Sequence, residues 1–338
     1  MHIQAATLDD LMHEVFEKVR SQGSRVESSR GSNVELSGVV LEILNPRARL
    51  SRTEIKGTPF SCLGEWLWYL SGSDDLKFIE YYIRDYGENS DDNLTVYGAY
   101  GPRVFRRANF AGVLWSLLRM PHRPFFWVRQ FDNVAQLLKR KASSRQAVIQ
   151  IFSGNDIIEQ HKDIPCTCTL QFLVRRGQLD LITHMRSNDA YLGLPHDVFS
   201  FTMFQEMMAR TIGIEIGRYA HFVGSLHIYE HNFEKVDDYI AEAWQSSTAM
   251  PPMPTGDPAK SLAWLVRTEL KIRRGGRLDN SSGHDDYWMD LARLLQAYSY
   301  VKSGARDEIN MLRKSMSSPI YDTYLLKRVD GATVGTNG

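Results

Sequence analysis

The sequence has few cysteines, no net charge and no long hydrophobic run. Its 338 residues include three cysteines, and 40 basic side chains balance 40 acidic ones. Three cysteines do not make a disulfide framework, and Cys166 and Cys168 lie too close together on one predicted strand to pair. We therefore expect a reducing, cytoplasmic environment.

These absences also exclude two classes of partner. A neutral chain lacks the excess of basic residues that binds nucleic-acid polymers or acidic membranes. No stretch reaches the roughly 20 apolar residues of a membrane span, and Asp9 and Asp10 stand where a secretion signal would be apolar. We expect neither a nucleic-acid polymer nor a membrane as partner.

The middle of the chain contains a long alternating hairpin. Two segments with period-two alternation, 166–174 and 178–185, are joined by Arg175-Arg176-Gly177, which predicts paired strands. Arg186-Ser187-Asn188-Asp189 follows the second strand, and Asp197 precedes a helical pattern. A thiol, cations and carboxylates thus lie on one segment. Each also has an ordinary explanation, because a cysteine can pack, Arg-Ser can end a solvated strand and an aspartate can cap a helix.

Two other stretches carry isolated charged residues. The segment Phe60–Gly72 predicts an apolar helix whose one acid, Glu65, either faces solvent or is kept for chemistry. Arg30 lies in a polar loop with Gly31, a composition that is typical of linkers.

Together, and in this order, the motifs resemble those of thymidylate synthase and its relatives the pyrimidine nucleotide hydroxymethylases, most of all the hydroxymethylases of cytidylate and deoxycytidylate. The matching elements are Pro165-Cys166, Gln171-Phe172, Arg186-Ser187-Asn188-Asp189, Leu192-Gly193-Leu194-Pro195, Asp197 and Gly224-Ser225-Leu226-His227-Ile228-Tyr229. The segment Glu65-Trp66-Leu67-Trp68-Tyr69-Leu70-Ser71-Gly72 copies a further helix motif of the family.

The resemblance implies an α+β fold of the thymidylate synthase type, with a large mixed sheet flanked by helices. It implies one catalytic domain over residues 1–330, and we expect a disordered tail at 331–338. It also implies a homodimer and 5,10-methylenetetrahydrofolate as co-substrate, with no metal. The family closes over its folate with a short apolar C-terminal segment, to which this chain has no match.

The resemblance also assigns roles to single residues. It makes Cys166 the nucleophile that adds to C6 of a pyrimidine, Glu65 the residue that manages water and protons, and Asp197 the residue that recognises the base. The expected phosphate ligands are Arg30, Arg145, Arg186 and Ser187, the sugar ligands are His227 and Tyr229, and the folate contacts are Tyr97, Asp189, Leu192, Gly193 and His196. Arginines near Cys166 are expected to favour its thiolate form.

The expectation of a dimer rests on the match of Arg145 to the family. Arg145 matches one arginine of a family pair that reaches across the dimer interface to the partner subunit's phosphate. Gln146 stands where the family has the other arginine. One charge of that clamp is therefore missing or supplied elsewhere.

Position 197 decides which base is recognised. Thymidylate synthases have Asn in this position, whose amide pairs with N3–H and O4 of uracil, and cytosine presents the reverse pattern. A carboxyl group suits cytosine, because when protonated it donates to N3 and accepts from N4, and when ionised it pairs with a ring protonated at N3. Cytidylate hydroxymethylases of the family carry Asp here. Asp197 therefore predicts a cytosine nucleotide.

Four further positions depart from the thymidylate synthases. Thr167, Met185, His196 and Ser225 stand where those enzymes have His, Gln, Phe and Asp. Such changes alter the lining around the folate and the carbon that it transfers. A hydroxymethylase must admit water to this place.

The predicted activity is therefore hydroxymethylation of CMP or dCMP at C5. The first alternative is a thymidylate synthase that methylates dUMP, and the second is a nucleotide-binding protein that has kept the fold and lost turnover. No residue near His227 and Tyr229 decides between ribose and deoxyribose. The use of the product, in a modified phage genome or in a pathway of the nucleoside-antibiotic type, stays open.

Overall fold

The computed structural model describes residues 1–28, 30–51, 59–105, 107–108, 127–242, 248–279 and 283–329. The tail expected at 331–338 lies outside these residues. No helix within these ranges combines the length and the apolar character that crossing a membrane requires.

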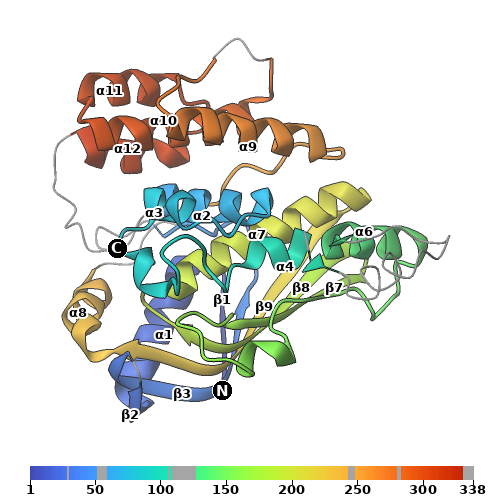
Figure 1. The fold of residues 1–338 in the computed structure, drawn as a ribbon, viewed down its shortest axis with the longest axis vertical. Coiled ribbons are helices and arrows are strands. Elements are labelled where there is room, and N and C mark those ends of the chain that lie inside the picture. The colour runs from blue at the N-terminus through green and yellow to red at the C-terminus, as the bar shows by residue number, and fades with distance from the viewer. Residues whose placement is uncertain are drawn as a thin grey trace.

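A mixed seven-stranded sheet forms one layer of the molecule (Figure 1). The strands follow the order β1-β3-β9-β8-β7-β6, and β2 pairs with β3. The pairs β1–β3 and β8–β9 are parallel, and the other pairs are antiparallel. The strands are β1 (His2–Ala5), β2 (Ser24–Ser28), β3 (Gly31–Ile43), β6 (Val148–Gln150), β7 (Thr167–Arg175), β8 (Gln178–Asp189) and β9 (Glu215–Tyr229), with a separate short pair of β4 (Arg107–Ala108) and β5 (Trp127–Val128). The expected mixed sheet is confirmed.

The predicted central hairpin is formed by β7 and β8. Its turn residues Arg176 (φ 52°) and Gly177 (φ 74°) both have left-handed backbones, as a tight turn between twisted strands requires. Beyond the turn, β8 runs parallel to β9, with Ser187 opposite Ser225 and Asp189 opposite His227. This register places the polar end of β8 beside the polar end of β9.

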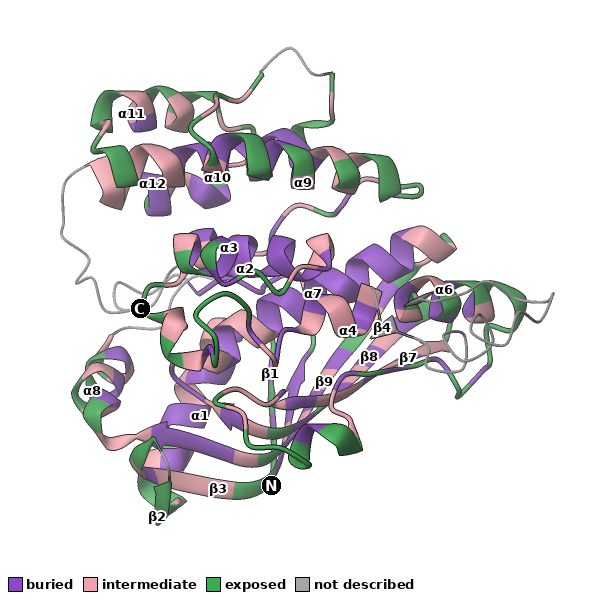
Figure 2. Cartoon of the chain, viewed as in Figure 1, coloured by how far each residue is buried: buried purple, intermediate pink, exposed green. Residues whose placement is uncertain are grey.

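Helices cover the sheet in layers. Helix α7 packs on β8 and β9 and is buried along most of its length, as its nearly continuous purple colour in Figure 2 shows. Helix α2 packs on α7, and α9 to α12 form an outer layer beyond α2 and α3 (Figure 1). The helices are α1 (Leu8–Gln22), α2 (Pro59–Ser71), α3 (Leu76–Tyr82), α4 (Tyr100–Phe105), α6 (Gln130–Arg140), α7 (Gly193–Ile212), α8 (Phe233–Ala241), α9 (Ala259–Arg273), α10 (Asp286–Ser303), α11 (Arg306–Ser315) and α12 (Asp322–Val329).

Helix α7 begins earlier than the sequence indicates. The apolar pattern predicts a helix that starts after Asp197, whereas α7 starts at Gly193 with Leu192 in the N-cap position. Asp197 therefore lies in the second turn, and the explanation of this residue as a cap is wrong. Asp189 instead orders the approach to the helix, because its Oδ1 accepts hydrogen bonds from the N–H groups of Tyr191 (2.8 Å) and Leu192 (3.0 Å).

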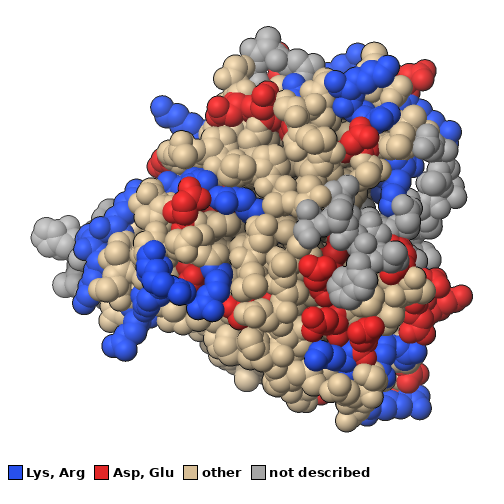
Figure 3. Space-filling model, turned by 180° about the vertical axis from the view of Figure 1, so that it is seen from behind, with Lys and Arg blue, Asp and Glu red and all other residues tan. Residues whose placement is uncertain are grey.

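The surface carries charges of both signs. On the face seen in Figure 3, groups of basic and of acidic side chains are separated by a broad uncharged area. This distribution agrees with a chain whose 40 basic and 40 acidic residues are equal in number.

A buried ion cluster ties α7 to the segment that follows β3. Glu206 accepts hydrogen bonds from Arg49 Nη2 at 2.6 Å and Arg47 Nε at 2.7 Å, and its Oε1 also accepts from the N–H of Met253 at 3.0 Å. The side chains of Arg49 and Glu206 are 0% and 1% exposed. Removing one member of such a pair leaves the other charge buried without compensation.

We therefore expect Glu206→Gln to lower the free energy of unfolding by about 3–5 kcal/mol. Asp132→Asn is the matched control, because Asp132 is 42% exposed and pairs with Arg129 on the surface. That change should cost less than about 1 kcal/mol. Urea unfolding followed by circular dichroism measures both, and equal effects of the two changes would contradict the role of the buried cluster.

Candidate active site

A single large cavity collects most of the residues expected to be functional. Its volume is about 1550 Å³, which exceeds the roughly 300–1,000 Å³ of an ordinary small-molecule site. The ends of β8 and β9, the start of α7 and one side of α2 contribute to its wall. The expected residues that line it are Arg30, Glu65, Cys166, Arg186, Ser187, Asp189, Leu192, Gly193, His196, Asp197, His227 and Tyr229. A cavity of this size has room for more than one ligand.

The thiol of Cys166 faces the guanidinium of Arg186. Arg186 Nη2 lies 3.7 Å from Cys166 Sγ, and the guanidinium also donates to the carbonyls of Pro165 (3.0 Å) and Ile164 (2.7 Å). These bonds fix the cation beside the sulfur. Burial nevertheless raises the pKa of Cys166 to about 11, since Arg186 only partly opposes it and the carboxyl groups of Asp197 and Asp163 add to the rise. Arg186 and Arg30 do favour the thiolate, as expected, but burial outweighs them in the cavity as it stands.

Glu65 is the centre of a second group of polar side chains. Its Oε2 lies 2.8 Å from His196 Nδ1, and its Oε1 accepts a hydrogen bond from the hydroxyl of Tyr69 at 2.9 Å. His196 Nε2 lies 3.3 Å from Ser61 Oγ. Burial opposes a charged imidazole, but Cys62 and the carboxylate of Glu65 outweigh it and raise the pKa of His196 to about 10. His196 is therefore protonated at neutral pH and donates from Nδ1 to Glu65.

Asp197 has an acidic side chain that keeps its proton near neutral pH. Burial and the nearby charge of Glu65 raise its pKa to about 8, although His196 and a hydrogen bond from Asn188 oppose the rise. The bond from Asn188 Nδ2 to Asp197 Oδ2 is 2.8 Å long. Below pH 8 the carboxyl group is thus mostly neutral and both donates and accepts hydrogen bonds.

A buried chain of side chains supports Asp197 from behind. Asn188 Oδ1 lies 3.1 Å from His221 Nε2, and His221 Nδ1 lies 2.6 Å from the hydroxyl of Tyr219. Burial lowers the pKa of His221 to about 3, so this ring is neutral and carries one N–H. The amino group of Asn188 donates to Asp197, so the Asn188 carbonyl accepts from Nε2–H of His221. His221 Nδ1 then accepts from the hydroxyl of Tyr219. We define Asn188, His221 and Tyr219 as the Asn188 relay.

Gly193 makes room for this arrangement. A Cβ atom at position 193 would lie 3.0 Å from Asn188 Nδ2 and 3.6 Å from Asp197 Oδ2. A larger residue would therefore press on the amino group that donates to Asp197.

The predicted phosphate and sugar ligands also come together. Arg30 lies in the turn between β2 and β3, where its Nη2 donates to Asn89 Oδ1 at 2.6 Å, and its positive charge acts on both Cys166 and Asp163. The rings of His227 and Tyr229 meet edge to face with centroids 5.0 Å apart. Both line the cavity from the same face of β9.

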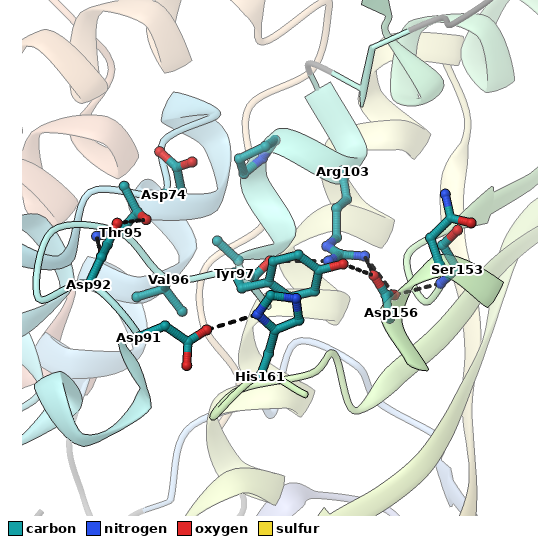
Figure 4. Close-up of a pocket in the computed structure, with 13 residues that line it drawn as sticks. Asp74, Asp91, Asp92, Thr95, Val96, Tyr97, Arg103, Ser153, Asp156 and His161 are labelled. Atoms are coloured by element: carbon teal, nitrogen blue, oxygen red, sulfur yellow. Dashed lines mark hydrogen bonds and ion pairs between the residues drawn. The ribbon is translucent and has the colours of Figure 1, made fainter. Parts of the chain in front are cut away.

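Two predicted site residues lie outside the large cavity. Tyr97 lines a smaller pocket of about 570 Å³, where its ring stacks on His161 at 3.5 Å and its hydroxyl donates to Asp156 at 3.1 Å (Figure 4). Arg145 is exposed and does not line the cavity. The dimer role of Arg145 stays a prediction.

Several residues of the cavity were not singled out from the sequence. Tyr100, three residues after Tyr97, lines the cavity and accepts hydrogen bonds from Thr167 N (3.2 Å) and Thr167 Oγ1 (3.0 Å). Asp163 and the Asn188 relay were missed as well. The signal for Tyr100 was present in the same aromatic segment, and His221 stood at an apolar position of a strand, which is unusual for a polar ring.

Comparison with known proteins bears on this cavity. The family model described as "Thymidylate synthase" matches residues 10–262. A protein named deoxyuridylate hydroxymethyltransferase from Bacillus phage SP01 is 31% identical over 241 residues, which cover 69% of this chain and 58% of the phage protein. A second protein of that name, from Pseudomonas phage M6, is 28% identical over 239 residues, with 69% and 63% covered. The chain thus spans about three fifths of the length of these relatives.

Proposed function

Because this chain belongs to the thymidylate synthase family, we propose that it transfers a one-carbon unit to C5 of a pyrimidine nucleotide, and that water completes the product as a hydroxymethyl group. The α+β fold with its mixed sheet is the one that this family predicts. The substrate that we propose is CMP or dCMP. The observation that carries this choice is a neutral carboxyl group, Asp197, in the same cavity as the thiol of Cys166.

The first chemical step is addition of the Cys166 sulfur to C6 of the ring. The electron pair of the C5–C6 double bond then moves toward C4 and N3 of cytosine. Asp197 in its neutral form donates its proton to N3, where the negative charge arrives. Arg186, 3.7 Å from the sulfur, stabilises the thiolate as the nucleotide displaces water from the cavity. In uracil the same charge would reach O4, so this acid suits cytosine.

The second half of the reaction needs a carbon donor and a water. When bound, 5,10-methylenetetrahydrofolate supplies a carbon at the oxidation level of formaldehyde, and the expected contacts Asp189, Leu192, Gly193 and His196 line the cavity beside Asp197. Loss of the C5 proton and departure of tetrahydrofolate would leave an exocyclic methylene on the ring. Glu65, held by His196 and Tyr69, would accept a proton from the water that adds to this methylene. Loss of the Cys166 sulfur from C6 then restores the ring. One methylene is transferred and one water is consumed, without an oxidant or a reductant.

Product analysis tests the proposal directly. The protein is incubated with 5,10-methylenetetrahydrofolate and with CMP, dCMP or dUMP, and the masses of the nucleotide products are measured by mass spectrometry. We expect a gain of CH2O on a cytosine nucleotide. A gain of CH2 on dUMP would instead show a thymidylate synthase.

A second candidate is hydroxymethylation of dUMP. It is favoured by the names of both phage relatives, which assign deoxyuridylate to those proteins. A gain of CH2O on dUMP, with CMP and dCMP unchanged, would establish it. Release of tritium from C5 of any of these nucleotides excludes the alternative of a binding protein without turnover, because that exchange needs the thiolate adduct.

The pH profile gives a further prediction. The rate constant kcat/KM for the cytosine nucleotide should rise about tenfold per pH unit below pH 8, because the thiolate fraction of Cys166 grows toward its pKa of about 11. The rise should stop near pH 8, where Asp197 loses the proton that it must donate. In Asp197→Asn the residual rate should keep rising above pH 8. A wild-type profile that climbs without a break to pH 10 would contradict this role of Asp197.

We also propose that the active form is a homodimer in which Arg145 reaches the phosphate of the nucleotide bound by the partner subunit. Arg145 is exposed and does not line the cavity of its own subunit, which supports this placement. Sedimentation should show a dimer, and Arg145→Ala should raise KM for the nucleotide roughly tenfold while the dimer persists. A monomeric protein with full activity would contradict both parts.

A further inference from the structure

One carboxyl group in the large cavity has no part in the reaction proposed above. Asp163 lies three residues before Cys166 and lines the same cavity. Among the described residues, none donates a hydrogen bond to its side chain. Removal of the proton at C5, a step that the proposed reaction requires, has no residue assigned to it.

The loop that carries Asp163 is anchored on the side that precedes it. Asp91 Oδ1 accepts a hydrogen bond from the N–H of Lys162 at 3.0 Å, and Asp91 Oδ2 lies 2.9 Å from His161 Nδ1 (Figure 4). The ring of His161 also stacks on that of Tyr97, with the two planes 9° apart. The backbone before Asp163 is therefore fixed to the segment that contains Asp91 and Tyr97.

Arg186 anchors the side that follows. Its guanidinium donates to the carbonyls of Ile164 at 2.7 Å and Pro165 at 3.0 Å, the two residues between Asp163 and Cys166. The same guanidinium lies 3.7 Å from the sulfur of Cys166. The backbone that joins the carboxyl group to the thiol is thus constrained along its whole length.

Gly98 provides the space for the carboxyl group of Asp163. A Cβ atom at position 98 would lie 2.2 Å from Asp163 Oδ2 and 2.8 Å from Asp163 Cγ, which is closer than real Cβ contacts allow. Tyr100, two residues later, accepts a hydrogen bond from the N–H of Thr167 at 3.2 Å. The carboxyl group therefore packs on the wall that meets the residue after Cys166.

Electrostatic effects agree with this placement. Burial raises the pKa of Cys166, and the charge of Asp163 adds to the rise. Burial also raises the pKa of Asp163 itself, although the charges of Arg30 and Arg186 oppose that rise. A carboxylate with a raised pKa is a stronger base than one in water. Asp163 is thus suited to take up a proton released next to the sulfur.

We propose that Asp163 is the base that removes the proton from C5 of the pyrimidine. This inference rests on the proposed function, since it assigns a step of that reaction. After Cys166 has added to C6 and the transferred carbon is bonded to C5, the carboxylate takes the C5 proton. The electron pair of the C5–H bond forms the exocyclic double bond, and the bond from the transferred carbon to the folate nitrogen breaks. Its electron pair stays on that nitrogen, which takes up a proton in turn, so atoms and charge balance.

The other two carboxyl groups have different tasks in the proposed reaction. Asp197 is mostly neutral below pH 8 and donates a proton. Glu65 acts on the water that adds after the folate has left. Asp163 is therefore the carboxyl group that the C5 proton can reach without a second use of either residue.

Asp163→Asn tests the inference, because the amide keeps the shape that packs on Gly98 and is not a base. CMP, dCMP and dUMP, each tritiated at C5, are incubated with 5,10-methylenetetrahydrofolate. For the nucleotide that the wild type turns over, tritium release and product formation should both fall by about 10²–10⁴-fold. Asp85→Asn is the matched control and should match the wild type. Asp85 lines the same cavity, and Asn tolerates its left-handed backbone (φ 62°) as well as Asp does.

Fluorinated nucleotides separate a base from a residue that only supports the loop. Fluorine at C5 of CMP, dCMP or dUMP cannot leave as a cation, so the reaction stops with Cys166 bonded to C6 and the transferred carbon bonded to C5. Asp163→Asn should form this adduct at least as fast as the wild type, because loss of a negative charge favours the thiolate of Cys166. Mass spectrometry of the intact protein measures the adduct, and a thermal melt compares the folding of the variants.

Two results would overturn the inference and leave the proposed function standing. Wild-type tritium release in Asp163→Asn would place the base elsewhere. Adduct formation that falls together with tritium release would show that Asp163 only supports the loop. A wild-type protein that neither releases tritium nor forms an adduct would reject the proposed function, and this inference with it.

Discussion

Cys166→Ala should lower the rate of product formation by roughly 10⁴-fold or more, and should abolish tritium release from C5. Both readouts depend on the bond between sulfur and C6, so both should disappear together. Binding of the nucleotide should change little, because Arg30, Arg186 and Asp197 remain. Product formation is measured by mass spectrometry and exchange by scintillation counting.

Cys168→Ala is the matched control for this change. Cys168 lies two residues further along the chain, is likewise a free and partly buried thiol, and does not line the cavity. Its replacement should alter the rate only a few fold. Exchange that survives in Cys166→Ala, or that is lost equally in Cys168→Ala, would remove the sulfur of Cys166 from the mechanism.

Asp197→Asn should lower kcat/KM for the cytosine nucleotide at pH 7 by roughly 10²–10⁴-fold. An amide has no proton to give to N3 as charge arrives there, and its amino group faces the N4 amino group of the base. Turnover of dUMP should rise, because the amide can pair with N3–H and O4. The rates with both nucleotides, measured side by side, give the change in preference.

Asp74→Asn provides the comparison for this second change. Asp74 is an acid that lines only the smaller pocket, so its replacement should leave the ratio of cytosine to uracil turnover unchanged. An Asp197→Asn variant with the wild-type ratio would show that the base is recognised elsewhere in the cavity.

The order of motifs in the sequence predicted residues that meet in the large cavity. Cys166 directly precedes β7 and Arg186 lies on β8, which pairs with β7, so period-two alternation was enough to place them at the same end of a hairpin. His227 and Tyr229 are two residues apart on β9, and their common face followed from the same rule. In both cases a local pattern determines the geometry.

Features that depend on distant parts of the chain were not predictable in this way. The pKa of Cys166 is set by burial among β8, α7 and the loop before β7, and residue spacing does not measure burial. Tyr97 and Tyr100 lie three residues apart in one aromatic segment, and the sequence pattern does not show that Tyr100 lines the large cavity and Tyr97 the smaller pocket. Contacts of Tyr298 with Phe60 and Tyr82 join residues more than 200 positions apart, outside any motif.

The direction of the hydrogen bonds in the Asn188 relay has a consequence for how base preference can change. Turning the Asn188 amide to present its carbonyl to position 197 would set its amino group against Nε2–H of His221. The ring would then have to move its proton to Nδ1, and the hydroxyl of Tyr219 would need another acceptor. Under the proposed role of Asp197, the choice between the two pyrimidines also depends on the three buried residues of the Asn188 relay. An enzyme that fully exchanges one base for the other must rebuild this inner support along with the side chain that touches the ring.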